Sequence, residues 1–363
     1  MRILHLAKRR YTNKDALAER FGRVYQLPLY WSARNHQVEL ALVDYHSLQK
    51  EQVAQDGFTT HSLPILDPLS FWRLKRIARA LQPDVIVASG DCFVGLIGYH
   101  ISRSACAPFV FDVYDDYSSF GSYRAFLGWN ALDFLLNRAD LVLYASRTLA
   151  DRHFARSKWV LTPNGVDTEK FRPGDTATAR RRIGLDGNVD TLVGYFGSME
   201  RDRGVDDLIV AVGQLHAIDS NIRLLLCGTL RPDLQPLPPW INYMGVVPHV
   251  AMPDYLNACD VLALPYRRSQ MMDMGASCKI AEYLLCERPL VATHTPNFSS
   301  NFPMQAVELG PAMCSPADAA DLARAISLQL QERRICSRPE DHAWPTIANN
   351  VLSSILGLGV HDI

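Results

Sequence analysis

The sequence predicts an α/β protein with two doubly wound parallel sheets, and three features of the chain support this fold class. First, apolar runs such as RILHLA, DVIVASG, TLVGYFGS and DVLALPY are nearly continuous, which is typical of strands buried on both faces of a parallel sheet. Second, helix-like segments separate these runs, which predicts right-handed βαβ units. Third, a stretch rich in Pro, Gly, Asn and Asp divides the runs into two groups.

The expected elements follow one another in a regular order. In the first half the strand-like runs are RILHLA, QVELALVDY, DVIVASG, PFVFDVYD and DLVLYAS, with helix-like segments at 15–32, 70–81 and 121–139. In the second half they are TLVGYFGS, RLLLCGT, INYMGVV, DVLALPY and PLVATHT, with helix-like segments at 205–218 and 253–258. This alternation predicts that each half forms its own sheet.

The length of the chain also favours two domains. A chain of 363 residues exceeds the usual size of a single hydrophobic core. The turn-rich stretch LTPNGVDTEKFRPGDTATARRRIGLDGN reads as the linker, with the boundary between 164 and 187. We therefore expect one domain at 1–163 and a second at 164–344. The tail at 345–363 is expected to form a helix that packs back on the first domain.

Composition excludes several classes of protein. Lys and Arg number 37 and Asp and Glu 38, and this balance argues against a dedicated nucleic-acid binder. The eight cysteines form no C-x-x-C pair, which favours buried free thiols in a reducing compartment. The apolar run at the N-terminus is too short for a signal peptide, and no run is long enough to span a membrane. The expected location is the cytoplasm.

One candidate site follows the run TLVGYFGS in the second half. The strand is expected to end at Gly197, and Gly204 opens the next helix. A helix N-terminus offers unpaired N–H groups and a partial positive charge, which suits a phosphate. Arg201 and Arg203 would add positive charge at the same place. The alternative is a surface loop with mixed charges.

A second candidate lies in the stretch GASCKIAEYLL. Lys279 and Glu282 are three residues apart, so they share one face of a helix. A lysine can neutralise a phosphate, and a glutamate can accept two hydrogen bonds from the vicinal diol of a ribose. The alternative is a weak surface ion pair between the two side chains.

Two further candidates lie in the first half. Asp112, Asp115 and Asp116 end a predicted strand, where carboxylates could hold acceptor hydroxyls, act as a base, bind a metal or cap a helix. Six basic residues follow the first strand and could grip a phosphorylated acceptor or an anionic membrane, or form a solvated helix face. These first-loop cations are Lys8, Arg9, Arg10, Lys14, Arg20 and Arg23.

Taken together, these stretches resemble family 4 of the retaining glycosyltransferases, which have the GT-B fold. The resemblance runs from TPNGVDTEKFRP through YFGSMERDRGVDDLIVAV and GVVPHVAMPDYLNACDVLALPY to GASCKIAEYLLCERPLVAT, and ARNHQVELALV adds to it in the first half. It implies two facing Rossmann-like domains with a cleft between them. The second domain would bind a nucleotide-diphosphate sugar, the first would bind the acceptor, and no metal or other cofactor would be needed.

The resemblance also assigns roles to residues. Arg203 matches the basic residue that faces the diphosphate, Glu282 matches the acidic residue that holds the donor ribose, and Lys279 would assist on the same helix turn. The expected donor-binding residues are Gly197, Ser198, Arg201, Val247, Asp273, Met274, Gly275, Ala276 and Ser277. The expected acceptor-binding residues are Arg10, Gly22, Arg23, Tyr114 and Asp115.

The sequence departs from the family pattern at two donor positions. Met274 stands where the family has its first acidic residue, so either Asp273 or the backbone of 275–277 would take over. Ser198 stands where an arginine is usual, and Arg201 would compensate. These departures leave room for a degenerate, non-catalytic partner protein, and a sugar-nucleotide epimerase is a further alternative.

The main expectation is a retaining hexosyltransferase. It would transfer a sugar to a glycan or lipid-linked acceptor in the synthesis of a cell-envelope polysaccharide or glycoconjugate. The basic first loop mildly favours a phosphorylated or membrane-held acceptor, with peripheral contact at the inner face of the membrane.

Overall fold

The computed structural model describes residues 1–11, 14–119, 129–186 and 190–359, and these fall into two compact units. The first unit comprises 1–165, 274–276 and 341–363, and the second comprises 166–273 and 277–340. The division lies after Gly165, within the expected linker. The C-terminal segment groups with the first unit.

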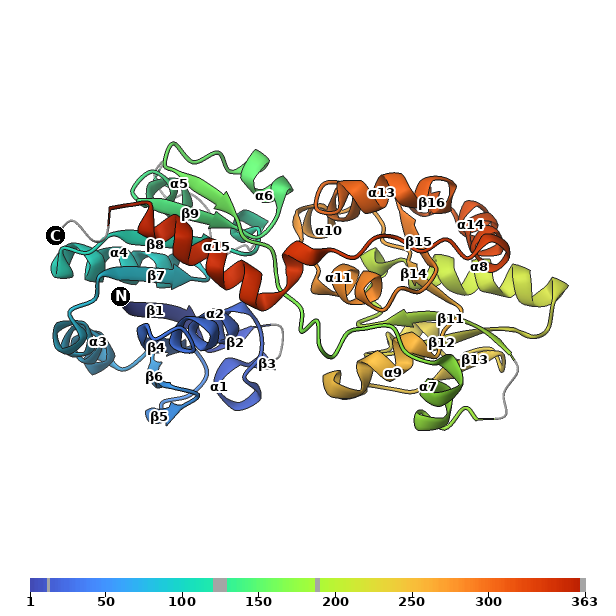
Figure 1. The fold of residues 1–363 in the computed structure, drawn as a ribbon, viewed down its shortest axis with the longest axis horizontal. Coiled ribbons are helices and arrows are strands. Elements are labelled where there is room, and N and C mark those ends of the chain that lie inside the picture. Colours follow the sequence, from blue (N-terminus) through green and yellow to red (C-terminus); the bar gives the residue numbers. More distant parts are fainter. Residues whose placement is uncertain (12–13, 120–128, 187–189, 360–363) are drawn as a thin grey trace. The chain divides into compact units, whose positions relative to one another are not determined.

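The described residues of the first unit form an eight-stranded sheet with the order β10-β9-β8-β7-β1-β4-β6-β5 (Figure 1). All neighbouring pairs are parallel except β5 and β6. The strands are β1 (Arg2–Lys8), β4 (Gln37–Asp44), β5 (Glu51–Gln55), β6 (Phe58–Pro64), β7 (Val85–Ser89), β8 (Phe109–Val113), β9 (Leu141–Tyr144) and β10 (Trp159–Leu161). A separate two-stranded ribbon, β2 (Arg10–Tyr11) and β3 (Lys14–Asp15), follows β1.

The hairpin of β5 and β6 was not expected from the sequence. Asp56 and Gly57 both have positive φ in its turn, as a tight hairpin requires. β5 is an edge strand, and its burial alternates between half-buried and exposed residues. The sequence EQVAQ therefore lacks the continuous apolar run that marks the central strands.

The helices of the first unit differ from expectation in two places. The segment 15–32 is divided into α1 and α2, because Arg20 (φ 52°) and Gly22 (φ 75°) take left-handed conformations that interrupt the helix. Of the expected helix at 121–139, residues 121–128 lie outside the described residues, and Ala131–Leu136 is helical. The helices are α1 (Ala16–Glu19), α2 (Arg23–Ser32), α3 (Pro68–Leu81), α4 (Cys92–Ala105), α5 (Ala131–Leu136), α6 (Arg147–Arg152) and α15 (Trp344–Leu356).

The C-terminal helix α15, red in Figure 1, packs within the first unit against α2. Trp31 Nε1 of α2 donates a hydrogen bond to the carbonyl oxygen of Ala348, 3.1 Å away. Apolar residues of α15 such as Ile347, Val351 and Ile355 are buried in the core of this unit. The apolar side of the tail therefore completes the first unit's core.

The described residues of the second unit form a six-stranded parallel sheet with the order β13-β12-β11-β14-β15-β16 (Figure 1). Its strands are β11 (Thr191–Phe196), β12 (Ile222–Cys227), β13 (Ile241–Tyr243), β14 (Val261–Leu264), β15 (Leu290–Thr293) and β16 (Met313–Cys314). Its helices are α7 (Thr176–Arg182), α8 (Val205–Ile218), α9 (Met252–Asn257), α10 (Gln270–Met274), α11 (Cys278–Leu285), α12 (Pro296–Ser299), α13 (Pro303–Leu309) and α14 (Ala319–Glu332).

The order of strands in each sheet determines where a ligand can bind. In both units the chain reverses direction across the sheet next to the first strand, at β7 and β1 in one and at β11 and β14 in the other. Ligands of such sheets bind beyond the carboxyl ends of the strands at this switch point. In the part of the chain that the structure describes, no helix is long and apolar enough to cross a membrane.

Candidate functional site

The carboxyl end of β11 carries the first part of the candidate site. Gly197 follows the strand with φ +136°, and a Cβ at this position would collide with Nζ of Lys279. The glycine therefore lets the ammonium group of Lys279 lie directly against the loop. The short 3₁₀ turn η3 (Arg201–Arg203) leads from this loop to Gly204 and α8.

Arg203 and Lys279, called here the cation pair, converge on two buried tyrosines. The guanidinium carbon of Arg203 lies 5.6 Å from the ring centroid of Tyr266. Lys279 Nζ lies 4.7 Å from the ring centroid of Tyr195 and 5.8 Å from that of Tyr266. Among the described residues no carboxylate forms an ion pair with either cation, and Nε of Arg203 is buried without a hydrogen-bond partner.

Burial of Lys279 changes its acidity. Burial, and next the positive charge of Arg203, lower the pKa of Lys279 from 10.5 to about 7. Two cations that lie close together without a carboxylate raise the free energy of the folded protein, because their charges repel each other and are poorly solvated. An anion bound between them would lower that free energy. The arrangement is therefore suited to a phosphate or diphosphate.

Glu282 lies one turn further along α11 but does not pair with Lys279. Its side chain is buried, and Oε1 lies 2.8 Å from Nε2 of His249. Among the described residues, Lys279 and Glu282 therefore do not form the surface ion pair that was the alternative interpretation. Sequence reasoning missed His249, which lies on the turn η5 (His249–Ala251) beyond β13, close to the expected Val247.

Two other expected donor residues form their own ion pairs. The exposed guanidinium of Arg201 lies 3.0 Å from a carboxylate oxygen of Asp233, so its charge is already balanced in part. The carboxylate of Asp273 accepts hydrogen bonds from Nε of Arg268 at 2.8 and 3.0 Å. Ser198 contributes its carbonyl oxygen, which accepts a hydrogen bond from the Tyr195 hydroxyl at 2.8 Å.

The loop 274–276 groups with the first unit, whereas Asp273 and Ser277 belong to the second. Ser146 Oγ donates to the carbonyl oxygen of Met274 at 2.9 Å. Asn164 Nδ2 donates to the carbonyl oxygen of Ala276 at 2.8 Å. The expected donor residues Met274, Gly275 and Ala276 are therefore held by side chains of the first unit.

Arg23 was expected to bind the acceptor, but the structure buries it in an ion pair. Its guanidinium forms a two-pronged contact with Asp112, with Nε–Oδ2 and Nη2–Oδ1 distances of 3.0 and 2.8 Å. Nη1 donates to the carbonyl oxygen of Thr162 at 2.9 Å. Arg23 is 4% exposed and Asp112 is fully buried, so this pair stabilises the fold and engages most of the donors of Arg23 within the unit.

The remaining expected acceptor residues surround this pair. The ring of Tyr114 lies 5.8 Å from the guanidinium carbon of Arg23, and Asp115 accepts a hydrogen bond from the hydroxyl of Tyr11. Gly22 precedes α2 with open space around it. Arg10 is half exposed, and its Nε lies 3.5 Å from a carboxylate oxygen of Asp15.

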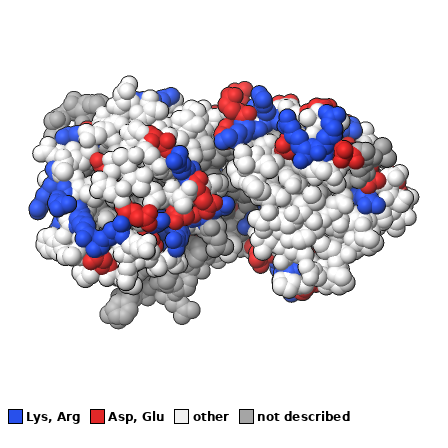
Figure 2. Space-filling view, turned by 90° about the horizontal axis from the view of Figure 1, so that it is seen from below, with Lys and Arg blue, Asp and Glu red and all other residues white. Residues whose placement is uncertain are grey.

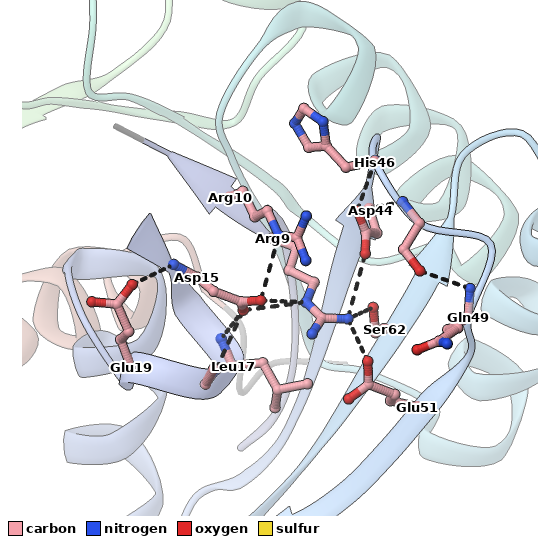
Figure 3. A network of polar contacts seen from close by, with 12 residues as sticks. Arg9, Arg10, Asp15, Leu17, Glu19, Asp44, His46, Gln49, Glu51 and Ser62 are labelled. Atoms are coloured by element: carbon pink, nitrogen blue, oxygen red, sulfur yellow. Dashed lines mark hydrogen bonds and ion pairs between the residues drawn. The ribbon is translucent and has the colours of Figure 1, made fainter. Parts of the chain in front are cut away.

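The whole group of first-loop cations is matched by carboxylates. Figure 3 shows the centre of this network, where Arg9 contacts Asp15, Asp44 and Glu51 at 3.1, 3.4 and 2.7 Å. The other pairs are Lys8–Asp91, Arg10–Asp15, Lys14–Glu19, Arg20–Asp56 and Arg23–Asp112. The positive charge of the first loop is therefore balanced locally in ion pairs, so a phosphorylated acceptor or a membrane would have to compete with these carboxylates.

The aspartates at the end of β8 and just beyond it do not form a metal-ligand set among the described residues. Asp112 pairs with Arg23, and Asp116 lies 3.0 Å from Nε2 of His153. Within the described ranges no group of three or more His, Cys, Asp or Glu side chains could hold a metal ion.

Two family models match successive parts of the chain. Residues 23–170 match the model described as Glycosyltransferase Family 4, and residues 190–332 match the model described as Glycosyl transferases group 1. Together these models cover most of both units, and the chain belongs to the group 1, family 4 glycosyltransferases. The predicted fold class, with two Rossmann-like units of the GT-B type, is confirmed.

Curated relatives share only part of their length with this chain. A D-inositol 3-phosphate glycosyltransferase of Stackebrandtia nassauensis is 30% identical over 125 residues, which are 30% of this chain and 28% of that protein. The D-inositol 3-phosphate glycosyltransferase 1 of Catenulispora acidiphila is 32% identical over 145 residues, which are 35% of this chain and 33% of that protein. The match thus spans a third or less of each of these relatives.

Solved structures are similar over nearly the whole chain. A sucrose-phosphate synthase from Thermosynechococcus elongatus has a TM-score of 0.68 at 17% identity, covering 99% of this chain and 95% of that one. HepE of Anabaena, solved in complex with UDP and glucose, has a TM-score of 0.64 at 17% identity, covering 99% and 97%. At these identities the similarity concerns the fold.

Proposed function

We propose that this protein is a retaining glycosyltransferase that uses a nucleotide-diphosphate sugar as donor. The observation that carries the proposal is the cation pair of Arg203 and Lys279, which lies at the carboxyl edge of the second unit's sheet without a carboxylate partner among the described residues. A nucleoside diphosphate is the anion that this family would bring to such a site. In this proposal the protein works in the cytoplasm.

The cation pair would act on the leaving group. During transfer the bond between the sugar's anomeric carbon and the phosphate oxygen breaks, and negative charge grows on the diphosphate. Arg203 and Lys279 would stabilise that charge, which is the largest contribution a protein makes to such a reaction. The acceptor oxygen forms the new bond on the same face of the sugar, and its proton passes to the departing phosphate oxygen.

Glu282 would hold the ribose of the donor. A carboxylate accepts hydrogen bonds from both hydroxyls of a vicinal diol, and Glu282 lies on the same helix as Lys279. His249, 2.8 Å from Oε1, would fix the orientation of the carboxylate. Arg203, Lys279 and Glu282 are thus the residues on which we expect donor binding and turnover to depend most.

For the donor and the acceptor we propose chemical classes of molecule. HepE was solved with UDP and with UDP-glucose, so UDP-sugars are the first donors to test here. The acceptor proposed is a glycan or lipid-linked molecule of the cell envelope. The names of the partial curated relatives make a phosphorylated polyol a second acceptor class to include.

The competing proposal is a non-catalytic partner of an active glycosyltransferase. It is favoured by Met274 at an expected acidic position and by the engagement of the neighbouring Asp273 with Arg268. Such a protein would retain the fold but release no nucleoside diphosphate from any donor.

The test measures nucleoside diphosphate release from a panel of nucleotide sugars, with and without an envelope extract or inositol phosphates as acceptor. We expect acceptor-dependent release with one donor, lost in Lys279→Met and retained in Arg201→Gln. The anomeric configuration of the product, read by NMR, decides whether transfer is retaining. Absence of both release and nucleotide binding would favour the non-catalytic partner, and conversion of the nucleotide sugar without acceptor would favour an epimerase.

A further inference from the structure

Helix α3 of the first unit exposes large apolar side chains beside unpaired positive charge. Leu69 and Trp72 on the helix are 56% and 64% exposed, and Leu66 in the preceding loop is 77% exposed. Arg76 and Arg79 follow on the helix and are also exposed. The ring centroid of Trp72 lies 5.6 Å from Nζ of Lys75, and the ring is otherwise largely exposed. Exposed apolar side chains grouped in this way mark a surface that binds a partner.

The helical period places these residues together. Positions 69, 72, 76 and 79 recur at the spacing of one helix face, which we call the outer face of α3. The opposite face, with Ser70, Leu74, Ala78 and Leu81, is buried in the unit. The apolar residues occupy the first turns of the outer face, and the arginines occupy its last turns.

The positive charge of α3 is not neutralised as that of the first loop is. The helix contains four basic residues and no acidic one between Pro68 and Leu81. Arg73 contacts the N-cap residue Asp67 at 3.2 Å. For Lys75, Arg76 and Arg79 the structure shows no ion pair with any described residue. Figure 2 shows the Lys and Arg side chains grouped in blue on the side of the first unit where α3 lies.

A cavity of mixed polar and apolar lining adjoins the basic end of the helix. It has a volume of about 540 Å³ and is lined by Lys75 and Arg79 of α3, by Arg2, and by the end of α4 around Ser104. Arg2 is paired with Asp84 at 2.7 Å, whereas Lys75 and Arg79 bring uncompensated charge to the rim. The cavity offers room for a negatively charged group at the basic end of α3.

We propose that the outer face of α3 docks onto an anionic lipid bilayer. Trp72, Leu69 and Leu66 would insert at the boundary of headgroups and acyl chains, where an indole is stable. Arg76, Arg79 and Lys75 would contact the headgroups of anionic lipids, with the adjacent cavity open to a headgroup. The chain as a whole has a net charge of −1, so the attraction depends on this local face.

The combination favours a membrane over the other polyanions. A nucleic-acid site would have cations with hydrogen-bonding or stacking groups along a groove. This face instead exposes Leu69 and Trp72 on the helix, with Leu66 in the loop before it. The proposal is independent of the proposed transferase activity. It moves the expected membrane contact from the first loop, where every cation has a carboxylate partner, to α3.

The test is sedimentation of the full chain with vesicles of phosphatidylcholine, alone or mixed with phosphatidylglycerol. We expect binding only to the mixed vesicles, weakened by salt, and reduced by about tenfold or more in R76Q/R79Q. The matched control R181Q/R182Q removes the same charge from exposed positions on α7 and should bind as the wild type does.

A second measurement locates the contact. Acyl chains brominated near the headgroup should quench part of the tryptophan fluorescence, and Trp72→Phe should lose that part while still binding. Equal binding to both kinds of vesicle, equal losses in the two arginine double variants, or quenching unchanged in Trp72→Phe would overturn the proposal. Binding to RNA or heparin without binding to mixed vesicles would overturn it as well.

Discussion

The basic residues of the first loop and those of the second unit's cation pair have opposite electrostatic surroundings. The six first-loop cations of the first unit each lie within 4.0 Å of a carboxylate. Arg203 and Lys279 of the second unit contact tyrosine rings and a glycine loop instead. A count of basic residues in the sequence favours the first loop, but an anion site requires cations whose charge is not already balanced. Local pairing, and not the number of cations, separates a structural network from a ligand site.

The largest expected effect is on the stability of the first unit. Arg23→Leu leaves the fully buried carboxylate of Asp112 without its partner, which should lower the free energy of unfolding by about 3–5 kcal/mol. Urea denaturation monitored by circular dichroism measures this change. The exposed neighbour variant Arg10→Gln should change it by less than about 0.5 kcal/mol. Equal effects of the two changes would contradict a structural role specific to the buried pair.

In the second unit, loss of a cation should affect catalysis and leave the fold intact. Arg203→Gln and Lys279→Met are each expected to lower kcat/KM by about 100-fold, because each removes stabilisation of the leaving diphosphate. Lys279→Met should not lower the free energy of unfolding, since it removes a charge that is costly to bury. Arg201→Gln, at an exposed ion pair, is the matched control and should retain activity.

Glu282→Ala should lower turnover by about tenfold or more while the fold remains intact, because the ribose loses its charged acceptor. His249→Gln should have a smaller effect of the same kind, seen mainly as weaker donor binding, since the carboxylate stays but loses its orienting partner. Steady-state kinetics with varied donor concentration separates the two. A larger loss in His249→Gln than in Glu282→Ala would show that the histidine, and not the glutamate, is the main contact.

The pH dependence of nucleotide affinity should follow the protonation of Lys279. Its pKa is about 7 in the free protein, and the groups around it include Arg203, Glu282, Cys278, Tyr195 and Tyr266. Since only the protonated amine attracts a diphosphate, the affinity for UDP should weaken above about pH 7, by up to about tenfold per pH unit. Calorimetric titration at several pH values measures this, and Lys279→Met should not show the pH-dependent weakening.

The lowered pKa of Lys279 changes the stability of the fold in the opposite direction to nucleotide affinity as the pH rises. The unfolded lysine keeps its ordinary pKa of 10.5, so between about pH 7 and 10.5 the unfolded state binds more protons than the folded state. The contribution of Lys279 to the free energy of unfolding therefore rises with pH in this window. The wild type should gain stability relative to Lys279→Met as the pH is raised, which urea denaturation at two pH values can check.

Much of the fold could be predicted because its central strands are buried on both faces. All ten strand-like runs are strands, from β1 to β15. The missed strand β5 is a half-exposed edge strand with a polar sequence. The missed helix α4 contains Gly95 and Gly98, which weaken a helical pattern but pack closely against Phe111 and Ala88.

The candidate site could be predicted only in part. Gly197 follows β11 directly, Arg203 lies on the turn that leads from β11 to α8, and Lys279 lies in the first turn of α11, in the crossover from β14 to β15. The topology of a doubly wound sheet brings these crossovers to the same edge. The pairing of His249 with Glu282 spans 33 positions and depends on the conformation of a short turn. The neutralisation of the first loop depends on Asp44, Asp56, Asp91 and Asp112, which lie far along the chain and carry no local signal for their partners.

The decisive measurement is a thermal-shift screen of the wild type and Lys279→Met against UDP, GDP, ADP, TDP and CMP. A ligand that binds only the folded state raises the melting temperature by mass action. We expect one nucleoside diphosphate to raise the melting temperature of the wild type and of Arg10→Gln, and to leave that of Lys279→Met unchanged. A shift that persists in Lys279→Met, or no shift of the wild type with any nucleotide, would contradict the assignment of the donor site to the second unit's cation pair.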